Sequence, residues 1–92
     1  MENIKHSWIR GAHCVYYWIW YLKSSPISVY NGGVKIMQHD DGKCQVTAEN
    51  ESLFDMMYKD DAPIFKSMEE AKAFGERMAT RFIEQRAASK QD

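Results

Sequence analysis

The chain has 92 residues, of which 45% are hydrophobic, 27% charged and 13% aromatic, and its formal net charge is −1. This length supports one domain with a thin hydrophobic core. The two prolines, the five glycines and the many aromatic residues exclude the disordered and low-complexity classes. The near-zero net charge argues against a duplex-binding protein. We therefore expect residues 1–92 to form a single folded domain.

The cysteines and the apolar run predict a cytoplasmic protein. Cys14 and Cys44 are the two cysteines, whereas a small secreted scaffold usually carries four or more. We expect reduced, buried thiols, with a disulfide across paired strands as the alternative. No stretch after Met1 resembles a secretory signal. The most apolar run, residues 14–22, has nine residues, short of the roughly 20 that a membrane helix needs, so we expect no membrane partner.

The first half of the chain predicts an antiparallel meander. Lys23–Pro26 and His39–Gly42 have the composition of strand breaks and turns. Asn31-Gly32-Gly33 predicts a tight hairpin turn, because Asn and Gly tolerate positive φ. Runs of β-branched, aromatic or alternating apolar residues predict strands at 14–22, 27–30, 34–37 and 43–48.

Helical spacing replaces the alternation after Glu49. The helical spacing of Leu53, Phe54, Met57 and Tyr58 indicates a short helix that Asn50 or Ser52 would cap. Asp60–Pro63 then breaks this helix, and the next two residues, Ile64 and Phe65, are expected to return to the core.

A long helix is predicted over residues 68–86. Ser67 and Glu70 have the spacing of a capping box, and Phe65 is placed to pack on the first turn. Residues 87–92 are expected to fray. The apolar stripe of this helix consists of Met68, Ala71, Phe74 or Gly75, Met78 and Phe82.

These elements predict an α+β fold, in which an antiparallel sheet of three to four strands packs on one long C-terminal helix, with a short helix before it. The strand at 14–22 is apolar on both faces, but a single helix covers only one. The N-terminal segment, with Ile4, Trp8 and Ile9, would supply part of a second layer. We expect the aromatic side chains left over to contact a second chain. That leftover set is either Tyr16, Trp18 and Trp20 or, on the opposite face, Tyr17, Ile19 and Tyr21.

No catalytic constellation emerges from the residue types that carry chemistry. His13, Cys14, His39 and Cys44 lack the close ligand pairs of a structural zinc site, and no third group orients a Cys/His nucleophile. The paired acids at 40–41 and 60–61 are typical of turns. We therefore expect no enzymatic activity, no cofactor and no metal.

Charge is unevenly distributed along the chain. Residues 1–38 carry a net +3, residues 39–70 a net −6 and residues 71–92 a net +2. This pattern indicates either an ordinary solvated surface or one face that docks on a charged partner. The candidate partner-binding residues combine the aromatic strand, the first turn and three cations: Tyr16, Trp18, Trp20, Tyr30, Asn31, Lys35, Arg77 and Arg81.

The layout resembles that of small proteins of phages and mobile elements, among them anti-CRISPR proteins. The resemblance lies in an aromatic strand, glycine-rich turns and a closing helix introduced by Phe65-Lys66-Ser67-Met68-Glu69-Glu70-Ala71-Lys72-Ala73-Phe74. It covers residues 14–86 and includes no diagnostic motif. It implies an inhibitor of a host defence system but assigns no role to any residue.

Two functions follow as hypotheses. The first is a small non-enzymatic binding or inhibitor protein that occludes a site on a larger protein or ribonucleoprotein complex, with a homodimer through the aromatic strand as a further partner arrangement. The alternative is a single-stranded nucleic-acid module in which sheet aromatics stack bases while Lys35, Arg77 or Arg81 contact phosphate. The net charge of −1 favours the first.

Overall fold

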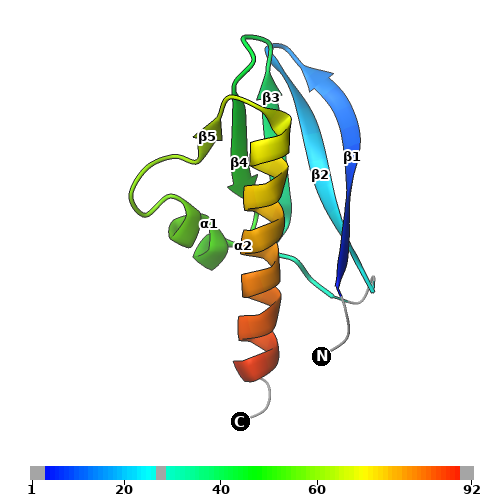
Figure 1. Cartoon of the computed structure of the whole chain (residues 1–92), viewed down its shortest axis with the longest axis vertical. Helices are drawn as coiled ribbons and strands as arrows, with labels where there is room; N and C mark the ends of the chain where they lie inside the picture. Colours follow the sequence, from blue (N-terminus) through cyan, green and yellow to red (C-terminus); the bar gives the residue numbers. More distant parts are fainter. Residues whose placement is uncertain (1–3, 27–28, 90–92) are drawn as a thin grey trace.

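A five-stranded antiparallel sheet with a long helix across one face forms the fold (Figure 1). The computed structural model describes residues 4–26 and 29–89. The predicted α+β architecture is confirmed, with one strand more than expected, and the strands lie in chain order. The elements are β1 (Lys5–Cys14), β2 (Tyr17–Ser25), β3 (Val34–His39), β4 (Cys44–Ala48), α1 (Glu51–Met57), β5 (Ile64–Phe65) and α2 (Met68–Ser89).

The aromatic segment is divided between two strands, so the prediction of one strand over 14–22 is wrong at its beginning. β1 ends at Cys14, Val15 and Tyr16 form a turn, and β2 runs from Tyr17 to Ser25. The N-terminal segment is therefore not a second layer. It is an edge strand that pairs with β2, with Trp8 opposite Leu22. The turn has two residues, which is the usual length for a turn that joins two directly paired antiparallel strands.

The connection between β2 and β3 is longer than a tight hairpin. Residues 27–28 of the predicted strand at 27–30 lie outside the described residues, and Val29 and Tyr30 are not in a strand. Gly32 and Gly33 do have positive φ, at 89° and 69°. Their conformation brings the Gly32 carbonyl to the backbone N–H groups of residues 49 and 50, which donate to it at 3.1 and 2.9 Å. The hairpin assignment is therefore wrong, although the positive φ is confirmed.

Local signals placed the next elements correctly. The turn between β3 and β4 closes through the His39 N–H, which donates to the Lys43 carbonyl at 2.8 Å. Asn50 caps α1, because its Oδ1 accepts from the Leu53 N–H at 3.0 Å. After α1 the chain returns to the sheet edge as β5, where Phe65 packs against the core but Ile64 stays exposed. The expectation that Ile64 is buried is wrong, because register places it opposite Gln45 on the face of the sheet that points away from the core.

The long helix α2 begins after Ser67, as predicted, and ends at Ser89, beyond the predicted end at Arg86. The Ser67 Oγ accepts from the Glu70 N–H at 3.2 Å and donates to the Glu70 carboxylate at 3.3 Å. Phe65 packs on Phe74, one turn deeper than expected, with ring centroids 5.3 Å apart. Over the described residues, neither helix has the length and apolar character needed to cross a membrane.

Substituting Ser67 tests this cap. Ser67→Ala should lower the free energy of unfolding by about 1 kcal/mol, because the Glu70 N–H loses its acceptor, whereas Ser67→Gly should cost only a few tenths. Urea denaturation of both variants measures the difference. Equal losses would mean that the Ser67 side chain stabilises the helix in some other way.

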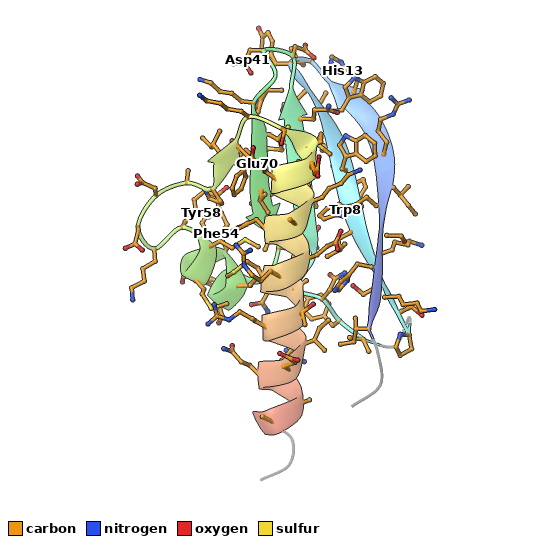
Figure 2. All side chains as sticks on the ribbon, in the orientation of Figure 1. Trp8, His13, Asp41, Phe54, Tyr58 and Glu70 are labelled. Atoms are coloured by element: carbon orange, nitrogen blue, oxygen red, sulfur yellow. The ribbon has the colours of Figure 1, made fainter. Side chains whose placement is uncertain are left out.

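The sheet has two different faces, which strand register defines. The helix face contains Trp8, Leu22, Val34, Ile36 and Val46, and α1 and α2 cover much of it. The Gly75 backbone comes so close that an added Cβ would lie 3.0 Å from Trp8, which places Gly75 against β1, while Phe74 packs on Phe65 of β5. Figure 2 shows Trp8 beside α2, with Phe54 and Tyr58 on the other side of this helix. We call the other face of the sheet, opposite the helix face, the open face.

Candidate binding surface

The eight candidate residues do not form one surface. Tyr16 lies in the β1–β2 turn and is 73% exposed, while Trp18 and Trp20 lie on the helix face of β2. Lys35 lies on the open face, opposite Tyr21 in β2. The others lie in the β2–β3 connection (Tyr30, Asn31) and on the exposed side of α2 (Arg77, Arg81).

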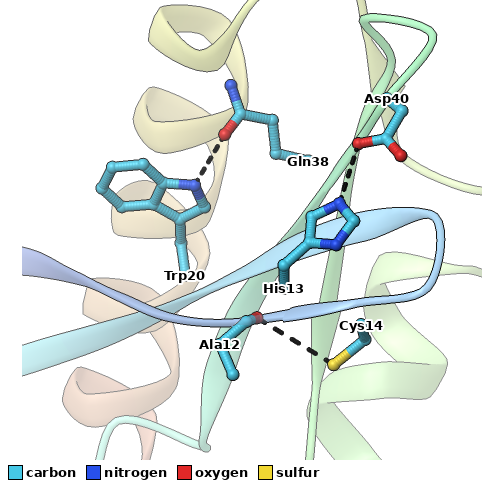
Figure 3. Close-up of polar contacts among 6 residues, drawn as sticks. All are labelled: Ala12, His13, Cys14, Trp20, Gln38 and Asp40. Carbon is cyan, nitrogen blue, oxygen red and sulfur yellow. Dashed lines mark hydrogen bonds and ion pairs between the residues drawn. The ribbon is translucent and has the colours of Figure 1, made fainter.

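Trp18 and Trp20 are covered by charged and polar side chains of the same chain. The Arg10 guanidinium lies 4.3 Å from the Trp18 ring centroid, and the Lys72 ammonium lies 4.8 Å from that of Trp20. The Trp20 indole N–H donates to Gln38 at 2.8 Å (Figure 3). These contacts occupy the ring faces that an aromatic hot spot would offer to a partner. The two tryptophans therefore stabilise the fold rather than form a free binding surface.

Asn31 is a structural residue. It is 8% exposed, and its Nδ2 donates to the Leu22 carbonyl at 3.0 Å and to the Ser24 hydroxyl at 2.9 Å. Its Oδ1 accepts from the Gly33 N–H. These bonds join the end of β2 to the beginning of β3, which leaves no amide group for a ligand.

The remaining candidates lie apart from one another. Tyr30 is 46% exposed and packs edge-on against Phe82, with ring centroids 5.8 Å apart. On α2, the Arg77 guanidinium lies 5.5 Å from the Phe74 ring centroid. Lys35 forms an ion pair with Glu49 at 3.3 Å. These three side chains therefore do not form one continuous binding surface.

The open face carries exposed apolar side chains on two neighbouring strands, β1 and β2. Ile9 on β1 is 47% exposed and lies opposite Tyr21 on β2, which is 43% exposed. The Tyr21 ring lies over Gly11, where an added Cβ would come within 2.7 Å of Cε2. Among the described residues, neither helix packs on this side. Its other apolar and aromatic members are Tyr17, Ile19, Met37 and His39, all partly exposed, and Ile64 of β5, which is 49% exposed.

Sequence reasoning found half of this face. The alternation in the aromatic segment already separated Tyr17, Ile19 and Tyr21 from the tryptophans. It missed Ile9, because the N-terminal segment was not predicted as a strand. It also missed Lys5 and Lys23, which register places on the same face. Residues 5–10 show no strict alternation, because the apolar Trp8 and Ile9 are adjacent, so only the strand register reveals this part of the face.

The metal and nucleophile candidates remain separate. The His13 Nε2 lies 3.0 Å from the Asp40 carboxylate at the end of the sheet where the β1–β2 and β3–β4 turns meet (Figure 3). Cys14 is half-buried and Cys44 buried, and both are free thiols, so the expectation of burial is confirmed only for Cys44. Burial raises the pKa of the Cys44 thiol. In the described part of the chain, no three His, Cys, Asp or Glu side chains are grouped as metal ligands.

A hollow of about 450 Å³ lies between α1 and α2. Leu53, Met56 and Phe82 form its apolar lining. Two of its polar groups already have partners, since Asn50 caps α1 and the Arg86 guanidinium lies 5.5 Å from the Phe82 ring. The hollow therefore offers few free polar groups to orient a ligand, and the open face is the stronger candidate. Comparison with family models, curated proteins and solved structures gives no match, so the interpretation of this face depends on its own residues.

Proposed function

We propose that the chain is a small non-enzymatic binding protein that docks through the open face on a larger protein or ribonucleoprotein complex and occludes a site there. The observation that carries this proposal is an uncovered apolar pair at the β1 edge of the face, where Ile9 and Tyr21 lie side by side and are each more than two-fifths exposed. Aromatic residues that a partner buries commonly dominate the affinity of an interface.

The layout shared with small phage proteins extends the proposal to inhibition of a host defence system, in the manner of an anti-CRISPR protein. The site of action is then the host cytoplasm. The two free thiols support this location, because reducing compartments keep cysteines unpaired.

Tyr21→Ser tests the docking surface. We expect this variant to bind the partner at least 30-fold more weakly, because a central aromatic contact commonly contributes 2 kcal/mol or more, or about that factor. The measurement is capture from a lysate of the source organism by the tagged chain, followed by affinity determination with the captured complex. Since Tyr21 is at the surface, the melting temperature should change little.

Tyr30→Ser is the matched control. Tyr30 is exposed to a similar extent, at 46% against 43%, but it packs on Phe82 of α2 rather than on the open face. We expect it to retain binding. Retention by Tyr21→Ser together with loss on charge reversal of Arg77 and Arg81 would place the docking surface on α2 instead and contradict the proposal. Sedimentation of the free chain identifies the case in which the partner is a second copy.

A further inference from the structure

The open face carries three aromatic rings, two on β2 and one on the neighbouring strand β3. Tyr17 and Tyr21 lie on β2, four residues apart, which is about 13 Å at 3.3 Å per residue. His39 on β3 lies opposite Tyr17, with ring centroids 5.4 Å apart and an interplanar angle of 52°. The contact of the Tyr21 ring with Gly11 holds that ring over β1 while 43% of the residue stays exposed. Exposed rings on a sheet are surfaces on which unpaired bases stack.

The charges that β1, β2 and β3 contribute to the same face are basic. From residue 3 to residue 39 the sequence contains four basic residues and no acidic one. Three of the four, Lys5, Lys23 and Lys35, lie on the open face, and the fourth, Arg10, covers Trp18 on the helix face. Lys5 and Lys23 are exposed and form no ion pair with any described residue, whereas Lys35 pairs with Glu49.

Acidic residues lie outside the first three strands. Asp55 in α1 and Asp60 and Asp61 before β5 lie beyond β4, at the edge of the sheet opposite β1, whereas Asp40 lies in the β3–β4 turn after His39, and Glu49 follows β4 and pairs with Lys35. The net charge of −1 therefore includes three strands, β1, β2 and β3, whose charged residues are all basic. A local field of this kind attracts polyanions although the whole chain is close to neutral.

We infer that the open face binds single-stranded nucleic acid, with bases on Tyr17, Tyr21 and His39 and phosphates near Lys5, Lys23 and Lys35. The inference rests on the proposed function, because it uses the same docking surface and names what this surface contacts in a ribonucleoprotein partner. Stacking on exposed rings needs bases that are not paired. This requirement favours a single strand over a duplex.

Fluorescence anisotropy with fluorescein-labelled oligo(dT), oligo(U) and a duplex of equal length tests the inference. We expect both single strands to bind and the duplex to bind more weakly. Three lysine–phosphate contacts predict a slope of about −2 for the logarithm of the binding constant against that of salt concentration, at about 0.7 per contact for single strands. Lys23→Gln should make the slope shallower by about 0.7, and Lys59→Gln, after α1, should leave it unchanged.

Tyr21→Leu separates stacking from simple apolar contact. We expect it to weaken oligonucleotide binding by roughly fivefold or more, the lower end of what loss of one stacked base costs, while the circular dichroism spectrum stays that of the parent chain. Tyr30→Leu should not weaken binding. Equal affinity for duplex and single strand, or no effect of Tyr21→Leu, would overturn the inference.

Failure of the inference is distinguishable from failure of the proposed function. If no oligonucleotide binds at low salt but nuclease-treated lysate still yields a partner that Tyr21→Ser loses, the open face binds a protein, and only the inference is overturned. If oligonucleotide binding and partner capture both survive substitution of Tyr21, the open face is not the docking surface, and both are overturned.

Discussion

Leu53→Ala should lower the free energy of unfolding by about 3 kcal/mol, in the range measured for buried leucines that leave a cavity. Leu53 is completely buried and belongs to the core cluster with Phe82 of α2. Its Cδ2 lies so close to Gly32 that an added Cβ there would clash with it. One side chain therefore joins α1, α2 and the β2–β3 connection. Urea denaturation followed by circular dichroism measures the loss.

Phe54→Ala is the comparison within the same helix. Phe54 is 37% exposed and stacks on Tyr58, with ring centroids 4.2 Å apart. Its removal leaves no enclosed cavity, so we expect a loss of about 1 kcal/mol, of the size of an aromatic pair at the surface. A loss for Leu53→Ala no larger than that for Phe54→Ala would mean that α1 is not docked as described.

Gly32→Ala should cost about 3 kcal/mol, and Gly42→Ala about 1 kcal/mol. Both glycines have positive φ, 89° and 97°, so both substitutions carry the strain of a left-handed residue. They differ in their surroundings, because an added Cβ at Gly42 meets nothing within 4 Å while one at Gly32 meets Leu53. Thermal and urea unfolding give the loss of stability for each variant, and the difference between the two losses measures the cost of overpacking at Gly32.

A double substitution identifies the contact. Leu53→Ala removes the atom that the new Cβ would meet, so Gly32→Ala combined with Leu53→Ala should cost clearly less than the sum of the single losses. Strict additivity would show that Gly32 is held by its backbone conformation alone and not by its approach to Leu53.

The parts of the fold that the sequence predicts correctly are those with local causes. The alternation from Val34 to Met37, the turn ending at Gly42 and the caps at Asn50 and Ser67 each depend on a few neighbouring residues. The turn at Val15 and Tyr16 has no such local sequence signal. Both residues favour strands, and Val15 adopts a φ of 39° that its side chain does not predict. The tertiary pairing of β1 with β2 imposes this turn.

The candidate surface is only partly predictable for the same reason. Alternation separates Trp18 and Trp20 from Tyr17 and Tyr21, but it does not say which set the helix covers. That choice depends on long-range contacts such as Gly75 on Trp8 and Lys72 over Trp20. The position of Lys35 beside Tyr21 also depends on register across the β2–β3 connection.

The central claim is that the sheet is covered on one face and open on the other. The most direct test is nuclear magnetic resonance of the free chain with a soluble paramagnetic probe, which relaxes side chains according to their exposure. We predict strong relaxation of Ile9 and Tyr21 on the open face and little of Ile36 and Val46 on the helix face, both of which are fully buried. Protection of Ile9 and Tyr21 equal to that of Ile36 would show that both faces are covered and would contradict the account.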